Sequence, residues 1–83
     1  MLDAKIVGKV IQKYREKSGL SQDVLSGLAD IGRSHLSAIE RGERRPSLDT
    51  FFKISGALNM VPSELMAAIE SEIDTTKENK ETR

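Results

Sequence analysis

Residues 20–48, LSQDVLSGLADIGRSHLSAIERGERRPSL, contain two short runs of apolar residues with a turn between them. Ser21 stands before the first run and can cap a helix with its hydroxyl group. Asp30 is a residue type that tolerates a left-handed backbone, so a second helix can begin about three residues later, at Arg33. Gly42 can end that helix in the left-handed conformation. The stretch therefore predicts two short helices joined by a tight turn.

Apolar residues continue at helical spacing on both sides of this stretch. A first helix is expected from about Asp3 to Ser18, Pro46 and Ser47 open a fourth, and Pro62 opens a fifth. The side chains that we expect to face the core from the first four helices are Ile6, Val7, Val10, Ile11, Tyr14, Val24, Leu25, Leu28, Leu36, Ile39, Leu48, Phe51, Phe52, Ile54 and Leu58. These patterns predict an all-α fold, a compact bundle of five helices with a helix-turn-helix at the second and third.

The composition argues against several classes of protein. The chain has no cysteine and one histidine, so it cannot form a disulfide framework, a thiolate zinc site or a multi-histidine metal site. No run approaches the roughly 18 apolar residues that cross a bilayer, and the N-terminus lacks a secretory signal, so we expect a cytoplasmic protein without membrane contacts. No phosphate loop, nucleophile elbow or paired-carboxylate motif is present. We therefore expect no enzymatic activity, no cofactor, no metal and no small-molecule ligand.

The formal net charge is zero, but the charges are not evenly distributed along the chain. Residues 1–63 have ten Lys and Arg against seven Asp and Glu, whereas residues 64–83 have three against six. Four of the six arginines lie within residues 32–47. A local basic cluster can attract a polyanion even on a neutral molecule. We expect residues 1–73 to form one domain and the polar residues 74–83 to form a disordered tail.

The stretch from Leu20 to Leu65 resembles, without a gap, the helix-turn-helix domain of the Cro/repressor-type (Xre) family. The most specific pieces are LSQ at the start of the second helix, S.IERG and RRPSL around the exit of the third, and ALN before the fifth. With the first helix included, the resemblance covers Ile6 to Ile69. It implies a lambda-repressor-like domain that binds double-stranded DNA sequence-specifically, acting as a transcriptional regulator and as a homodimer on a palindromic operator.

The resemblance also implies roles for particular residues. Arg33 is the main candidate for reading bases, because a guanidinium can pair with guanine O6 and N7. The full base-contact set is Arg33, Ser34, Ser37 and Ala38. The phosphate contacts implied are Ser21, Gln22, Arg41, Arg44 and Arg45. A partly buried ion pair between Arg15 and Glu40 would fix the recognition helix against the scaffold.

Three residues depart from the family pattern. Ser26 stands where the second helix usually has alanine, Asp30 where the turn usually has glycine, and Gly32 where serine or threonine usually caps the third helix. All three are compatible with the bend. The weaker cap and Gly27 within the second helix predict a modestly stable motif.

Several alternatives stay open from the sequence. The apolar residues of the fifth helix could cover only their own core or could also pair with a second copy. We hypothesise a homodimer through residues 62–73, with the interface formed by Leu65, Met66, Ile69 and Ile73. The alternative function is a protein-interaction module or antitoxin component with the same fold. Restriction-modification controllers, small phage repressors and some antitoxins share this size and plan, and the sequence does not choose among them, between activation and repression, or among operators.

Overall fold

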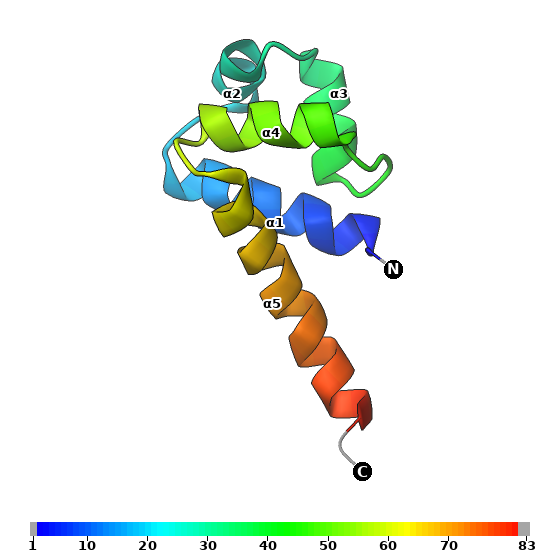
Figure 1. Cartoon of the computed structure of the whole chain (residues 1–83). Helices are drawn as coiled ribbons and strands as arrows, with labels where there is room; N and C mark the ends of the chain where they lie inside the picture. The colour runs from blue at the N-terminus through cyan, green and yellow to red at the C-terminus, as the bar shows by residue number, and fades with distance from the viewer. Residues whose placement is uncertain (1, 82–83) are drawn as a thin grey trace.

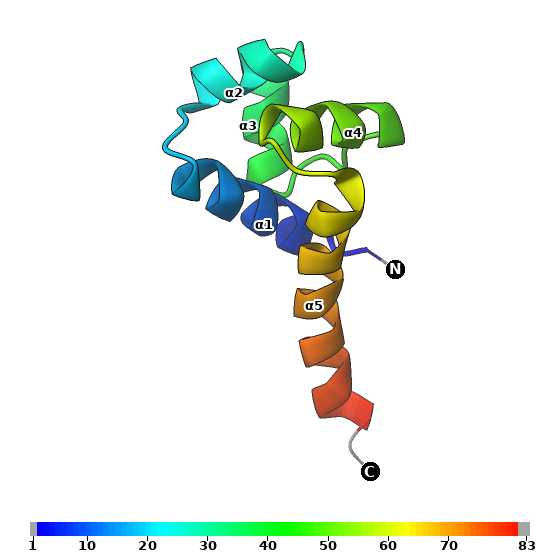
Figure 2. The ribbon, with the colours of Figure 1, turned by 60° about the vertical axis from the view of Figure 1, so that its left-hand side comes forward.

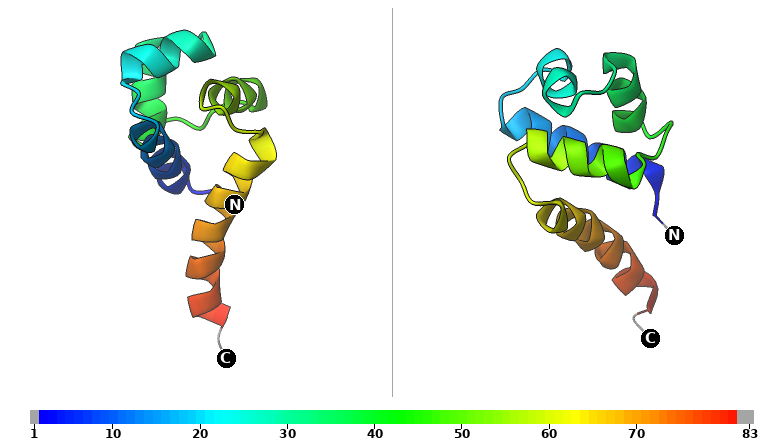
Figure 3. Two further views of the ribbon diagram at one scale, coloured as in Figure 1. Left: turned by 90° about the vertical axis from the view of Figure 1, so that its left-hand side faces the viewer. Right: turned by 45° about the horizontal axis from the view of Figure 1, so that its top comes forward.

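The computed structural model describes the backbone of residues 2–81 and the side chains of residues 2–73. The described residues form five α-helices and no strand: α1 (Ala4–Lys17), α2 (Gln22–Ala29), α3 (Arg33–Glu40), α4 (Leu48–Ala57) and α5 (Pro62–Glu81). This confirms the predicted all-α bundle and its helix-turn-helix. Figure 1 shows α2 and α3 at one end of the molecule, with α5 leading away from the other helices. The views in Figures 2 and 3 agree with this arrangement.

Local residue chemistry sets the ends of these helices. Asp3, Ser21 and Ser47 each accept a hydrogen bond from a backbone N–H in the first turn of α1, α2 and α4. The predicted cap at Ser21 is therefore confirmed. Asp30 has φ 57° between α2 and α3, and Gly42 has φ 79° after α3, so both adopt the predicted left-handed conformation.

The core draws apolar side chains from all five helices. Those with at most 1% exposure are Ile11, Leu25, Ala29, Leu36, Ile39, Ile54, Leu65 and Ile69. α2 packs against α4, and α1 packs against α3 and α5. The core thus lies between the helix-turn-helix and the scaffold formed by α1, α4 and the first half of α5.

Four side chains predicted to face the core are instead exposed: Val24 (48%), Leu28 (62%), Leu48 (74%) and Phe52 (61%). Each lies beside the buried stripe of its helix. The buried faces of α2 and α4 include Ser26 and Ser55, whose hydroxyls donate to the carbonyls of Asp23 and Phe51. Because these hydroxyls are paired within their own helices, small polar residues can occupy the buried face, and the larger apolar neighbours point outward.

The first half of α1 approaches α3 at the level of the backbone. A Cβ added to Gly8 would lie 2.2 Å from the carbonyl oxygen of Ile39 and 2.7 Å from that of Glu40. A Cβ on Gly42 would lie 2.9 Å from the Cα of Lys5. Glycine is required at both places for this close approach. The contact fixes the C-terminal end of α3 against α1.

The fifth helix differs from the prediction in two respects. Leu65 and Ile69 have 0% exposure inside their own core, so they have no surface to offer a second copy. The predicted domain boundary at residue 73 is not an end of the helix, because α5 continues to Glu81. The side chains of residues 74–83 lie outside the described residues, and the predicted disorder of that tail stays a prediction. None of the described helices combines the length and apolar character that a membrane crossing needs.

Candidate nucleic-acid interface

The turn between α2 and α3 is closed by backbone hydrogen bonds. The N–H of Asp30 donates to the carbonyl of Gly27 at 3.2 Å, and the N–H of Ile31 donates to the carbonyl of Ser26 at 3.0 Å. Gly32 then precedes α3 without a side-chain cap, as predicted. The turn therefore sets where α3 begins, and no side chain caps the first N–H groups of this helix.

The predicted base-contact residues lie on the outer side of α3. Leu36 and Ile39 are fully buried on the inner side, which leaves the opposite side of the helix facing outward. Arg33 and Ser34 are exposed, and Ser37 and Ala38 are half-buried. Apart from Arg33, these four side chains are small, so they present few steric obstacles to entry into a groove.

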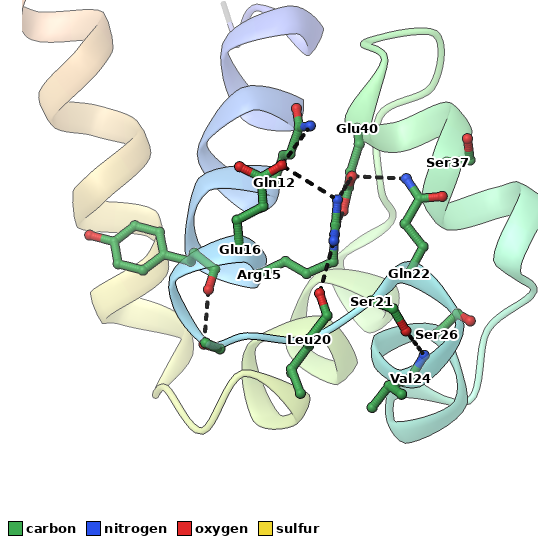
Figure 4. Close-up of polar contacts among 12 residues, drawn as sticks. Gln12, Arg15, Glu16, Leu20, Ser21, Gln22, Val24, Ser26, Ser37 and Glu40 are labelled. Carbon is green, nitrogen blue, oxygen red and sulfur yellow. Dashed lines mark hydrogen bonds and ion pairs between the residues drawn. The ribbon is translucent and has the colours of Figure 1, made fainter.

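A network centred on Glu40 holds α3 in place (Figure 4). The predicted ion pair is present: Arg15 Nε donates to Glu40 Oε2 at 2.7 Å, and Arg15 Nη2 donates to Glu40 Oε1 at 3.0 Å. Arg15 Nη1 donates to the carbonyl of Leu20 at 2.9 Å. The Arg15 and Glu40 side chains are 11% and 3% exposed. The bidentate hydrogen bond to Glu40 raises the pKa of Arg15, against the opposing effect of burial.

The same network includes a residue for which the sequence suggested only DNA contact. Gln22 Nε2 donates to Glu40 Oε1 at 2.9 Å, so the first residue of α2 is held against the last residue of α3. One N–H of the amide is used in this contact, and an amide nitrogen has two. The ion pair across α1 and α3 thus also orients the start of α2. Sequence spacing alone gave no signal for this hydrogen bond.

Among the described residues, three of the four arginines within residues 32–47 have partners in the chain. Arg33 Nε lies 3.2 Å from Asp23 Oδ1, with both side chains mostly exposed. Arg41 donates from Nε and Nη2 to the two carboxylate oxygens of Glu43, each at 2.9 Å, and from Nη1 to the hydroxyl of Ser37. This pairing raises the pKa of Arg41 and lowers that of Glu43.

The last two arginines of the cluster differ from each other. Arg45 donates from Nε and Nη2 to the carbonyl of Leu2, at 3.2 Å and 3.0 Å, and so ties the N-terminal segment to the loop before α4. Arg44 is exposed. The geometry therefore leaves Arg44 as the most available of the predicted phosphate contacts and directs Arg45 to the protein's own backbone. No signal in the sequence indicated the contact between Arg45 and Leu2.

Ser21 uses its hydroxyl to cap α2, and the hydroxyl accepts from the N–H of Val24 at 3.1 Å. Met66 and Ile73 are half-buried, unlike the two other residues of the predicted dimer interface. Among the described residues, no cluster of three or more histidine or acidic side chains could hold a metal ion.

Comparisons with known proteins identify the family. The model of the family HTH_3, described as helix-turn-helix, matches residues 11–65. The control protein C.MunI of a Mycoplasma species is 42% identical over 74 residues, which cover 87% of this chain and 100% of that protein. Among solved structures, the restriction-modification controller protein C.AhdI from Aeromonas hydrophila is 35% identical with a TM-score of 0.74, covering 78% of this chain and 98% of the other.

A further solved structure has a nucleic acid in it. The restriction-modification controller protein C.Esp1396I, a tetramer in complex with its natural 35-base-pair operator, is 25% identical to this chain with a TM-score of 0.80. The match covers 88% of this chain and 96% of that one. The family model spans well over half of the sequence, and C.MunI is matched over its whole length. The chain therefore belongs to the helix-turn-helix family HTH_3.

Proposed function

We propose that this protein is a transcriptional regulator that binds double-stranded operator DNA by inserting α3 into the major groove. The observation that supports this most directly is the Glu40 network. It fixes α3 to α1 and to the start of α2, while the opposite side of α3 consists of small side chains with the exposed guanidinium groups of Arg33 and Arg41 beside them. A rigid helix with a free polar face is what base reading in a groove requires.

The proposed contacts follow from position. Arg33 would read a base, because its side chain is exposed at the start of α3 and a guanidinium can form a bidentate contact with guanine. Ser34, Ser37 and Ala38 would line the same groove. Phosphates would be held by Arg41, Arg44 and the second amide N–H of Gln22, with free backbone N–H groups at the start of α2 beside Ser21. Arg45 would contribute less to phosphate binding, since its guanidinium already donates to the carbonyl of Leu2.

Among the possible roles, a restriction-modification controller is the best supported. C.MunI is matched over its entire length, and C.AhdI over 98% of its chain. Under this proposal the protein acts in the cytoplasm, on the DNA that it binds there. Genes for a methyltransferase and an endonuclease beside its own gene would support the controller role, whereas a phage operon or a toxin gene would contradict it.

Two arginine variants test DNA binding and separate its two components. Arg44→Ala should weaken binding to every sequence. It should also make the negative slope of log K against log salt less steep by about 0.9, because one phosphate contact is lost. Arg33→Ala should instead cost about 1–3 kcal/mol on the operator and relax the preference at one base pair. Fluorescence anisotropy on random and selected duplexes measures both. The proposal fails if the parent shows no salt-dependent binding, and the base assignment fails if Arg33→Ala keeps the parent's preference.

The homodimer remains part of this proposal, with a different surface from the one predicted. Leu2, Leu48 and Met66 line one apolar cavity of about 80 Å³. Leu2 is 40% exposed and Leu48 is 74% exposed, and Phe52 lies one turn from Leu48 on the same side of α4. A palindromic operator requires two recognition helices related by a two-fold axis. We place the dimer contact on Leu48, Phe52 and Met66, with Ile73 further along α5.

Sedimentation velocity tests this surface. Leu48→Asp should convert a micromolar dimer into a monomer, because the two-fold axis brings two carboxylates into an apolar contact. Leu28→Asp is the matched control, since Leu28 is 62% exposed but lies on α2. It should leave the oligomeric state unchanged. Equal behaviour of the two variants would rule out this surface.

A further inference from the structure

Glu43 occupies the part of Arg41 that would bind a phosphate. Arg41 Nε and Nη2 each donate to one carboxylate oxygen of Glu43, at 2.9 Å in both cases. This is the parallel, two-bond geometry in which a guanidinium holds a phosphate. Arg41 Nη1 also donates to the hydroxyl of Ser37, so the side chain is folded back over the outer face of α3. A carboxylate of the chain itself is therefore placed where a DNA phosphate would be expected.

The contact does not have the features of a stabilising ion pair. The side chains of Arg41 and Glu43 are 55% and 59% exposed. Exposed ion pairs contribute little to stability because solvent and salt screen them. The buried pair of Arg15 and Glu40, with 11% and 3% exposure, already fixes this end of α3. Since the pair of Arg41 and Glu43 adds little to the stability of the fold, we expect it to affect the binding of a charged partner to this surface.

The pair of Arg33 and Asp23 provides a contrast within the same surface. The ion pair of Asp23 and Arg33 is longer, with 3.2 Å between Asp23 Oδ1 and Arg33 Nε, and the two side chains are 77% and 65% exposed. Asp23 therefore holds Arg33 less tightly than Glu43 holds Arg41. Glu43, by contrast, takes one terminal nitrogen of Arg41 together with Nε. The two carboxylates thus differ, because Asp23 holds Arg33 in a longer, more exposed ion pair whereas Glu43 holds Arg41 through two hydrogen bonds.

We propose that Glu43 acts as an internal substitute for a DNA phosphate and limits the affinity of the protein for DNA. This inference rests on the proposed function. DNA that approaches α3 must displace Glu43 from Arg41 or leave Arg41 paired. In either case the contact of Arg41 with a phosphate contributes less binding free energy than the same contact of an unpaired arginine. The negative charge of Glu43 also opposes the backbone at that point. A protein that must search a long duplex gains from such a limit, because most phosphates belong to sites that it should leave.

The test compares Glu43→Gln with Glu70→Gln by fluorescence anisotropy on a random-sequence duplex over a series of salt concentrations. Glu70 is exposed on α5, the helix that leads away from α3, so its variant makes the same change of charge elsewhere (Figure 1). Freeing one phosphate contact should steepen the salt slope by about 0.9 and tighten binding by roughly 3- to 10-fold at low salt. Glu70→Gln should change both quantities much less.

A second pair of variants shows whether the effect passes through Arg41. In the background of Arg41→Ala, Glu43→Gln should improve binding no more than Glu70→Gln does, since no guanidinium remains to be released. The inference is overturned if Glu43→Gln and Glu70→Gln are equal in the parent background, or if the gain persists without Arg41. A parent protein that does not bind DNA at low salt would instead overturn the proposed function itself.

Discussion

Gly8→Ala is expected to destabilise the protein by about 3 kcal/mol, near the upper end of the cost of overpacking. The new Cβ would lie 2.2 Å from the carbonyl oxygen of Ile39 and 2.7 Å from that of Glu40. Both atoms belong to the backbone of α3, which cannot rotate away as a side chain can. To relieve the overlap, α1 must move from α3 and weaken the contact that holds the recognition helix. Thermal unfolding followed by circular dichroism measures the loss.

A matched glycine separates this steric effect from helix propensity. Gly56 lies within α4, and a Cβ added there would meet no atom within 4 Å. Gly56→Ala should therefore stabilise the protein by about 0.5–1 kcal/mol, because alanine loses less backbone entropy than glycine in a helix. In a domain of this size, a shift of 1 kcal/mol moves the unfolding midpoint by roughly 4–8 °C. If the two variants had similar midpoints, the close packing of α1 on α3 would be refuted.

Features that depend on local residue chemistry could be predicted from the sequence. The cap at Ser21, the left-handed Asp30 and the left-handed Gly42 follow from residue type and position. The buried positions Leu36 and Ile39 follow from helical spacing. The ion pair of Arg15 and Glu40 followed from the family resemblance, because nothing local links two residues on different helices.

Features that depend on how the helices meet could not be predicted in the same way. The sequence predicts Leu48 and Phe52 in the core because α4 has more than one apolar stripe, and periodicity does not say which stripe is buried. The choice depends on the approach of α2 to α4, where Ser26 and Ser55 are buried. The contact of Arg45 with Leu2 joins residues far apart in sequence and needs the folded chain to be seen.

The predicted DNA-contact set shows the same division. Its residues were identified by position in the motif, and the structure leaves Arg33, Ser34 and Arg44 exposed. The motif does not show how the chain uses these side chains when no DNA is bound. Glu43 is an acidic residue among arginines, but its bidentate contact with Arg41 depends on the turn at Gly42 and needs the folded chain to be seen.

The second large effect is expected at Glu40. Glu40→Ala should destabilise the protein by about 3–5 kcal/mol, because it leaves Arg15 charged and largely buried without its carboxylate. The Nε2 group of Gln22 would lose its acceptor in the same step. Removal of one partner of a buried pair costs more than the net stabilisation by the pair, because the remaining charge is still poorly solvated. Urea or thermal unfolding of the variant measures the loss of free energy.

Glu16 provides a control on the same arginine. Its carboxylate lies 4.0 Å from Arg15 Nη2, but its side chain is 61% exposed, so Glu16→Ala should change the free energy of unfolding by about 1 kcal/mol or less. Glu40→Gln retains an acceptor for Arg15 and Gln22, and should lie between the two variants. Equal stability of Glu40→Ala and Glu16→Ala would mean that the network does not hold α3. The proposed reading of DNA by α3 requires a fixed orientation of this helix. Glu40→Ala should therefore also weaken operator binding under conditions in which the variant is still folded, whereas Glu16→Ala should not.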